Sequence, residues 1–285
     1  MDNGLLNGRN IIVTGGGQGI GRAMTLGLVK RGAFVIAVDI VTSAVNAVAA
    51  EARILAGKKS VLALTADVSN REGCESAVER ALAECGTVHA IVNNAGRGMT
   101  AIRSDYLQNP PRFWEVDPDR WQAVMDLNLR GPFLLARVIT PHLLTHGWGR
   151  IVNVTTSFDT MYRAAYTPYG PSKAALEAST ASWAKDLEGS GVTCNALIPG
   201  GAVNTAFFAA DAPLDRSSLI QPDVMVPPIC WLMSDASDGV TGMRYVAREW
   251  DVNLPPDEAA RKSGNPAAWP SLGGQSLWPG GKPVR

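Results

Sequence analysis

Tyr169 and Lys173 are the residues whose types and spacing most directly suggest chemistry. They lie four positions apart in a segment with helical character, so their side chains share one face of the predicted helix. A phenol has a pKa of about 10, too high for a base at neutral pH, but a neighbouring ammonium group favours the phenolate and lowers that pKa. Tyr169 is therefore predicted to act as a general acid/base on an alcohol or carbonyl oxygen. Taken alone, the two residues would be an ordinary exposed pair on a helix.

A glycine-rich turn near the N-terminus is a second candidate site. It follows a predicted strand at residues 10–14 and leads into a predicted helix at about 19–31. Glycine lets the backbone turn sharply and approach a pyrophosphate, and the N-terminus of the helix offers free N–H groups to that phosphate. The residues expected to bind a dinucleotide here are Gly15, Gln18, Gly19, Ile20 and Gly21.

Asp39, 24 residues beyond Gly15, is the last residue of the next predicted strand, 33–39. A carboxylate at that place can accept both ribose hydroxyls of an adenosine and repels a 2′-phosphate. No Arg or Lys follows Asp39, and Gln18 is neutral where a phosphate-binding base could lie. NAD is therefore the predicted cofactor. An NADPH-preferring enzyme is the alternative.

Short β-branched runs alternate with longer helical stretches along the chain. Alternation of this kind indicates parallel βαβ units with right-handed crossovers, hence one doubly wound α/β (Rossmann) domain. We assign this domain to residues 1–249 and a separate C-terminal arm to 250–285. Strands are predicted at about 10–14, 33–39, 60–66, 89–93, 150–156, 192–198 and 243–247. Helices are predicted at about 19–31, 43–56, 71–85, 118–145, 169–187 and 223–234.

Three motifs, in this order and spacing, resemble the short-chain dehydrogenase/reductase family. They are Thr14-Gly15-Gly16-Gly17-Gln18-Gly19-Ile20-Gly21, Asn93-Asn94-Ala95-Gly96 and Tyr169-Gly170-Pro171-Ser172-Lys173. The resemblance runs from about residue 8 to 247. It implies a seven-stranded parallel sheet of order 3-2-1-4-5-6-7 with helices on both faces. It also implies a nicotinamide cofactor, whose ribose Lys173 would hold, and a catalytic Asn-Ser-Tyr-Lys tetrad.

The serine of that tetrad lies 13 residues before the tyrosine in the family. This chain has Thr156 at that position, followed by Ser157. Neighbours on a regular strand point to opposite faces, so both hydroxyls cannot face the nicotinamide. Thr156 keeps a hydroxyl for the substrate oxygen, although its methyl group restricts χ1. We predict Thr156 as the catalytic hydroxyl, with Ser157 as the alternative if the strand ends or bulges here.

Asn128 lies inside the predicted helix 118–145, for which Asp117 is the expected N-cap. Pro132, four residues later, has no N–H, so the Asn128 carbonyl lacks a helical partner and is free to bind a water. The resemblance implies that such a water connects the catalytic lysine to solvent. The complete predicted catalytic set is Asn128, Thr156, Tyr169 and Lys173.

Further cofactor contacts follow from the resemblance. Asp67 and Val68 end the third strand, where the family holds the adenine, and Pro199-Gly200 resembles the family loop over the nicotinamide. The loop after Gly200 is one residue longer than the common pattern. The implied contacts outside the glycine-rich turn are Asp39, Asp67, Val68, Asn93, Ala95, Gly96, Tyr169, Lys173, Pro199, Gly200, Val203 and Thr205.

Composition excludes several classes of protein. Lys plus Arg and Asp plus Glu both number 26, and no basic run is present, so neither a nucleic acid nor an anionic membrane is an expected partner. The longest apolar runs are too short to span a bilayer, and the N-terminal residues do not resemble a signal peptide. The four cysteines form no CxxC pair, which favours free thiols and a cytoplasmic location. His142 and His146 have metal-ligand spacing but no third ligand, so no metal is expected.

The predicted function is that of an NAD-dependent oxidoreductase interconverting a secondary alcohol and a ketone. The alternatives are an NADPH-preferring carbonyl or oxoacyl reductase, and a dinucleotide-binding sensor or scaffold without turnover. The substrate pocket is expected from residues 97–115, 158–167 and 201–221. A homo-oligomer, tetramer or dimer, is expected, because family members commonly pair the helices equivalent to 121–144 and 169–187 across a two-fold axis.

The last 36 residues contain six prolines, which exclude a long helix, and three of the eight tryptophans. Large apolar side chains are costly to leave in water. The segment is therefore predicted to be an extended arm, mostly without regular structure, that Trp250, Trp269 and Trp278 hold against the domain or a neighbouring subunit. A disordered tail is the alternative.

Overall fold

The computed structural model describes residues 4–57, 59–209 and 211–271. In this part of the chain, eight strands form one sheet in the order β3-β2-β1-β4-β5-β6-β7-β8. The predicted order of seven parallel strands is confirmed, and β8, which the sequence did not predict, adds an antiparallel edge. The strands are β1 (Asn10–Thr14), β2 (Phe34–Asp39), β3 (Val61–Thr65), β4 (Ala90–Asn93), β5 (Gly149–Val154), β6 (Val192–Ile198), β7 (Met243–Val246) and β8 (Gly264–Pro266).

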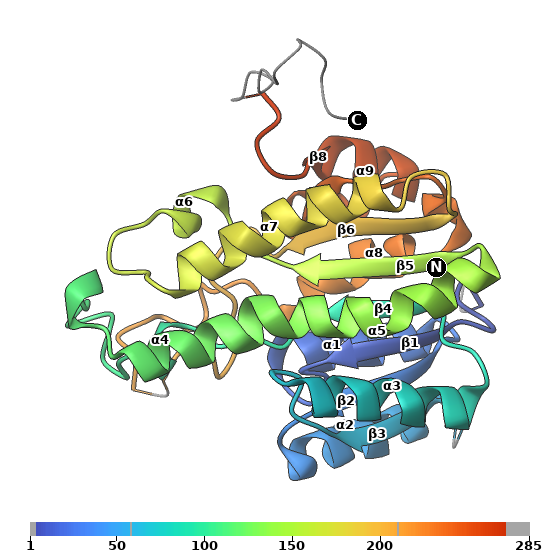
Figure 1. Ribbon diagram of the computed structural model, residues 1–285, viewed down its shortest axis with the longest axis horizontal. Coiled ribbons are helices and arrows are strands. Elements are labelled where there is room, and N and C mark those ends of the chain that lie inside the picture. Colours follow the sequence, from blue (N-terminus) through green and yellow to red (C-terminus); the bar gives the residue numbers. More distant parts are fainter. Residues whose placement is uncertain (1–3, 58, 210, 272–285) are drawn as a thin grey trace, which may run out of the picture.

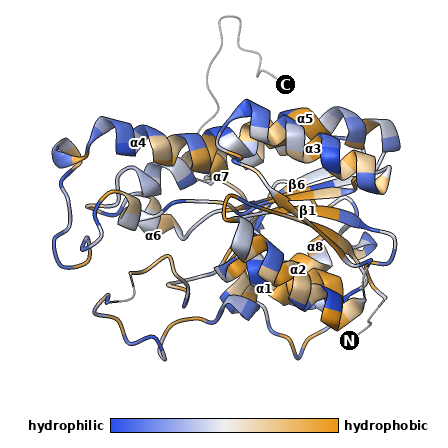
Figure 2. Cartoon of the chain, turned by 90° about the horizontal axis from the view of Figure 1, so that it is seen from below, coloured by the Kyte–Doolittle hydropathy of each residue, from blue (hydrophilic) through white to orange (hydrophobic). Residues whose placement is uncertain are grey.

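Helices cover both faces of the sheet (Figures 1 and 2). Helices α1, α2 and α8 lie on one face, while α3, α5 and α7 lie on the other. Burial on both faces explains why the central strands are runs of Val, Ile, Leu and Ala rather than alternating sequences. The helices are α1 (Gly19–Lys30), α2 (Thr42–Ala56), α3 (Arg71–Cys85), α4 (Pro118–Met125), α5 (Gly131–His146), α6 (Phe158–Met161), α7 (Tyr169–Asp186), α8 (Val226–Leu232) and α9 (Pro256–Ser263).

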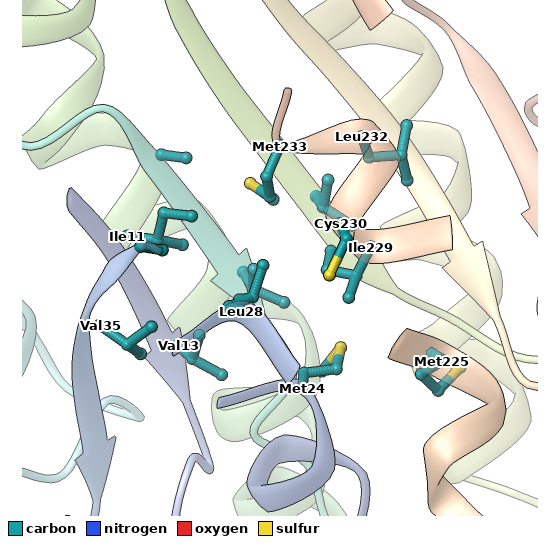
Figure 3. Packing of buried hydrophobic residues seen from close by; sticks show 14 of the residues in the cluster. Ile11, Val13, Met24, Leu28, Val35, Met225, Ile229, Cys230, Leu232 and Met233 are labelled. Atoms are coloured by element: carbon teal, nitrogen blue, oxygen red, sulfur yellow. The ribbon is translucent and has the colours of Figure 1, made fainter. Parts of the chain in front are cut away.

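The larger apolar core lies between the sheet and α1, α2 and α8. Figure 3 shows side chains from β1 and β2 meeting those of α1 and of α8 with its flanking residues. Met24 and Leu28 of α1 are completely buried. This core fixes α1 against the sheet and so fixes the glycine-rich turn that joins β1 to α1. The labelled residues are Ile11, Val13, Met24, Leu28, Val35, Met225, Ile229, Cys230, Leu232 and Met233.

The long helix predicted for residues 118–145 is divided. Asp117 caps α4 by accepting hydrogen bonds from the N–H groups of Asp119 and Arg120, as the sequence predicted. A π-helical turn, Asp126–Arg130, then separates α4 from α5. Pro132 gives the physical reason, because it has no N–H to continue the i→i+4 pattern.

Three segments project beyond the carboxyl ends of the parallel strands. They are the stretch between β4 and α4, the stretch between β5 and α7 that includes α6, and the loop after β6 (Figure 1). Ligands of open α/β sheets bind beyond these strand ends. The three segments match the ranges from which the sequence predicted a substrate pocket.

The described part of the C-terminal segment differs from the predicted arm, since residues 256–266 form α9 and β8. Strand β8 pairs with β7, whose outer edge would otherwise expose unpaired backbone groups. Trp250 is buried against Trp231, with ring centroids 5.7 Å apart, and Trp269 lies 5.9 Å from Phe158. Trp278 falls outside the described residues.

Within the described ranges, no helix combines the length and apolarity needed to cross a membrane. The same residues bring no group of three or more His, Cys, Asp or Glu side chains into a metal-binding arrangement. His142 Nε2 accepts a hydrogen bond from the N–H of Val88, and the rings of His142 and His146 are 4.3 Å apart.

Candidate active site

Tyr169 and Lys173 lie in the first turns of α7, beside the carboxyl end of β5. Lys173 Nζ donates a hydrogen bond of 2.7 Å to the Val154 carbonyl and is almost completely buried. The Thr156 hydroxyl lies close enough to the Tyr169 phenol to lower its pKa. The structure therefore brings three of the four predicted catalytic side chains together at one strand end.

The pKa of Tyr169 is higher than the sequence led us to expect. Burial raises it to about 12, and the Thr156 hydroxyl only partly opposes this effect. Burial also lowers the pKa of Lys173 to about 8. In this structure the Lys173 ammonium group donates to the Val154 carbonyl, and it is not among the groups that shift the Tyr169 pKa, which are the burial of the phenol, Thr156 and Tyr166.

Thr156, and not Ser157, meets the phenol. Strand β5 ends at Val154, so the alternation of a regular strand no longer applies at 156 and 157. Thr155 is buried and directs its hydroxyl to Glu177, while Ser157 begins α6 without capping it. The geometry thus favours Thr156 between the two predicted hydroxyls.

Asn128 occupies the middle of the π-helical turn and is completely buried. Its amide oxygen accepts from the N–H of Arg97, and its amide nitrogen donates to the Arg97 carbonyl and to the Ser172 hydroxyl. Ser172 in turn donates to the Tyr169 carbonyl. The side chain of Asn128 therefore ties the segment after Gly96 to the start of α7. Ser172, which the sequence analysis did not include in the site, is part of this link.

The glycine-rich turn lies against Asp39. The Gly17 N–H donates a 3.0 Å hydrogen bond to Asp39 Oδ2, and the Val41 N–H donates one of the same length to Asp39 Oδ1. A Cβ atom at Gly17 would lie 2.9 Å from Asp39 Oδ2, so glycine permits this close approach. Gly15 and Gly19 have positive φ angles of 61° and 50°, which glycine adopts without strain.

Threonine and asparagine side chains hold the turn to the neighbouring strand. Thr14 Oγ1 accepts from the N–H groups of Asn94 and Ala95, and Asn94 Nδ2 donates to the Thr14 carbonyl. A Cβ atom at Gly21 would lie 1.9 Å from the Gly15 carbonyl oxygen. The first two sequence motifs therefore form one connected unit at the carboxyl ends of β1 and β4.

The remaining predicted cofactor residues border this unit. Val68, Asn93 and Ala95 lie together beside Pro132 of α5. Asp67 accepts from the N–H and hydroxyl of Ser69; burial raises its pKa, but these hydrogen bonds outweigh burial and leave the pKa lowered.

The loop after β6 reaches both halves of the site. A Cβ atom at Gly19 would lie 3.0 Å from Thr205 Cγ2, so Thr205 adjoins the glycine-rich turn despite the extra residue in its loop. Val203 is buried and pairs with Ile220. Gly200 has φ of 93°, and the preceding Pro199 carbonyl accepts from the Arg248 N–H.

Phe207, in the same loop, lies against the ring of Tyr169. Its ring centroid is 5.4 Å from that of Tyr169, edge to face. A Cβ atom at Gly98 would lie 2.0 Å from Phe207 Cζ, so the ring fills the space that a side chain at 98 would take. The surroundings are apolar, with Phe208, Tyr106 and Met99 in the same cluster.

The comparisons with known proteins agree with this geometry. The family model described as short chain dehydrogenase matches residues 9–213. The chain is 32% identical to the 3-oxoacyl-acyl-carrier-protein reductase FabG of Thermotoga maritima, over 83% of this chain and 95% of the relative.

Two solved structures are similar throughout the domain. A short-chain dehydrogenase from Shigella flexneri, complexed with NADP, has a TM-score of 0.75 and 27% identity, covering 87% of this chain and 100% of that one. A 3-ketoacyl-acyl-carrier-protein reductase from Brucella melitensis, complexed with NADH, has a TM-score of 0.72 and 27% identity, covering 83% and 95%. With the ordered motifs and the arrangement of their side chains, the family match shows that this chain belongs to the short-chain dehydrogenase/reductase family.

Proposed function

We propose that the protein is an NAD-dependent dehydrogenase that interconverts a secondary alcohol and a ketone, with Tyr169 as general acid/base. Membership of the family makes it an oxidoreductase of the nicotinamide-dependent kind. The observation that carries the finer proposal is the group at the end of β5. There the Thr156 hydroxyl lies beside the Tyr169 phenol, with the buried Lys173 one helical turn away.

The glycine-rich turn and Asp39 fit a dinucleotide. The turn is too close to Asp39 for any side chain at Gly17, and the first N–H groups of α1 follow it. These features support a pyrophosphate at the helix N-terminus and adenosine ribose at Asp39. When bound, a nicotinamide dinucleotide supplies the hydride acceptor or donor. A bound 2′-phosphate would meet the Asp39 carboxylate, which supports NAD over NADP.

The catalytic side chains have distinct roles in this proposal. The Thr156 hydroxyl holds the substrate oxygen, and the Tyr169 oxygen takes the alcohol proton in oxidation or gives a proton to the carbonyl in reduction. Lys173, one helical turn from Tyr169, would favour the phenolate together with the positive charge of a bound nicotinamide. The Asn128 carbonyl, to which Pro132 offers no N–H, would hold a water that connects Lys173 to solvent.

The apolar cluster around Tyr169 supports a substrate with an apolar or cyclic group beside the reacting carbon. Phe207 and Phe208 come from the loop after β6, and Tyr106 comes from the stretch before α4. Arg216 holds this loop by donating to the Thr205, Phe208 and Ala209 carbonyls. It is therefore occupied by the loop itself, which favours an uncharged substrate.

An NADPH-preferring oxoacyl reductase is the second candidate, because the Thermotoga and Brucella proteins are named 3-oxoacyl- and 3-ketoacyl-acyl-carrier-protein reductases, and the Shigella structure is complexed with NADP. Fluorescence titration with NADH and NADPH, followed by assays on secondary alcohols and on a 3-oxoacyl thioester, separates the two. We expect tighter binding of NADH and turnover of apolar secondary alcohols. Preference for NADPH together with turnover of the thioester would establish the second candidate instead.

Asp39→Ser gives a sharper test of the cofactor. Loss of a carboxylate that accepts ribose hydroxyls should weaken NADH binding about tenfold or more. The same change removes a repulsion, so the ratio of NADPH to NADH affinity should rise. An unchanged ratio in a folded variant would contradict the role given to Asp39.

We also propose a homo-oligomer in a reducing compartment such as the cytoplasm. Helix α5 exposes Phe133 and Leu144, which supports an interface on the side of α5 and α7. All four cysteines are free thiols, which supports a reducing environment. Light scattering at micromolar concentration tests the first point, since a monomeric mass would contradict it.

A further inference from the structure

The face of α7 that carries Tyr169 and Lys173 continues to Glu177. The three residues are spaced four apart, so they form one stripe along the helix. Glu177 has no exposed surface, and its Oε2 accepts a 2.6 Å hydrogen bond from the Thr155 hydroxyl. The stripe therefore extends from the proposed catalytic residues to a contact with Thr155, just beyond β5. The proposed chemistry does not use this contact.

Arg244 on β7 completes this contact from the other side. Its Nε donates a 2.9 Å hydrogen bond to Glu177 Oε1, and its guanidinium is almost completely buried. A terminal nitrogen of the same group donates to the Thr156 carbonyl at 3.4 Å. The ion pair thus contacts two consecutive residues, Thr155 through its hydroxyl and Thr156 through its backbone carbonyl.

The C-terminal segment closes the ion pair off from solvent. Asn265 of β8 pairs with Arg244, and the N–H of Ala268 donates to Glu177 Oε1 at 3.4 Å. The Phe158 ring lies 3.9 Å from the Arg244 guanidinium carbon and contacts Trp269. Residues far apart in the sequence thereby enclose one charged pair beside the proposed active site.

Stability alone does not account for this pair. Two charges lose their hydration when buried, and replacing such a pair by apolar side chains is often neutral or stabilising. We infer that Glu177 and Arg244 are positioning residues, which fix the turn at 155–156 and thereby hold the Thr156 hydroxyl against Tyr169. This inference rests on the proposed function for the importance of that hydroxyl.

The test uses the double variant Glu177→Gln/Arg244→Met, which leaves no unpaired charge in the interior. Gln keeps an acceptor for Thr155, while the contact with the Thr156 carbonyl is lost. We expect kcat to fall about tenfold to hundredfold, since small displacements of catalytic groups have effects of this size. NADH affinity should stay nearly unchanged.

A double-mutant cycle with Thr156→Ala shows whether the pair acts through the hydroxyl. If it does, the double variant should cost little in the Thr156→Ala background, where no hydroxyl remains to be positioned. Arg150→Met is the matched control, because Arg150 is also buried and ion-paired, with Asp238, but at the amino end of β5. This control should leave kcat unchanged.

Hydrogen–deuterium exchange of residues 154–158 gives a readout that does not need turnover. Exchange there should rise severalfold in the double variant and stay at the wild-type level in Arg150→Met. Equal losses of kcat with and without Thr156, or unchanged exchange in the double variant, would overturn the inference. If the wild type oxidises no alcohol but exchange of residues 154–158 still rises in the double variant, the proposed function is contradicted while the positioning of the turn remains supported.

Discussion

The two ends of the sheet both bury cations beside aromatic rings, yet they are arranged differently. At the amino end, Trp148 has the guanidinium carbons of Arg9 and Arg150 within 4.0 Å of its ring centroid, and Arg150 is paired with Asp238. At the carboxyl end, Lys173 and Arg244 hold the backbone of residues 154 and 156.

The partners of these groups explain the difference. At the amino end, polar contacts end on the backbone or on other structural groups; His89, for example, accepts from the Asn10 N–H. At the carboxyl end, the backbone that Lys173 and Arg244 hold carries the Thr156 hydroxyl, which lies beside the Tyr169 phenol. A buried charge therefore does not by itself mark an active site. What distinguishes the proposed active site is that the segment held by the buried charges carries a hydroxyl beside a phenol, which can exchange a proton.

The largest effect should come from Tyr169→Phe. Removal of the group that transfers the proton should lower turnover by about 10²- to 10⁴-fold, while NADH binding, measured by fluorescence, stays nearly intact. Substantial turnover in this variant would contradict the role of Tyr169 and, with it, the difference proposed between the two ends of the sheet.

A smaller effect separates the two hydroxyls. Thr156→Ala should reduce kcat by roughly 10²-fold, the cost typical of losing one hydrogen-bond donor to a reacting oxygen, whereas Thr156→Ser should remain active. Ser157→Ala should matter much less, since it lies at the start of α6 away from the phenol. Steady-state assays of the three variants decide this, and a greater loss in Ser157→Ala would reverse the assignment.

The smallest effect concerns the amino end and pH. Burial, followed by the nearby charge of Arg9, lowers the pKa of His89, and burial also lowers that of His142. The folded protein therefore binds these protons less readily than the unfolded chain, whose histidines titrate near 6.5. The free energy of unfolding should consequently decrease as the pH drops below that value.

Thermal melting between pH 7.5 and 5 tests the direction of this pH dependence. The melting temperature of the wild type should decrease by a few degrees more than that of His89→Asn, which keeps an acceptor near the Asn10 N–H but does not titrate. Equal slopes for the two proteins would show that His89 contributes nothing to the pH dependence of the amino end.

Much of the fold and of the site was predictable for local reasons. The family, the order of seven parallel strands and the oxidoreductase class are confirmed. The N-cap at Asp117 was predicted from local groups, and Pro132, four residues after Asn128, gives a local reason for the π-helical turn that divides the predicted helix. Glu177 could have been found as well, because it continues the spacing of Tyr169 and Lys173 along one helix face.

The sequence alone predicts which residues carry the proposed chemistry, since that prediction needs only residue types and spacings within single elements, such as Tyr169 and Lys173 on α7. Only the tertiary structure decided their environment. It raised the Tyr169 pKa through burial, placed Phe207 against the Tyr169 ring, joined Arg244 to Glu177 and added β8 to the sheet. These features depend on contacts between residues tens of positions apart, and desolvation and long-range pairing have no signature in local spacing.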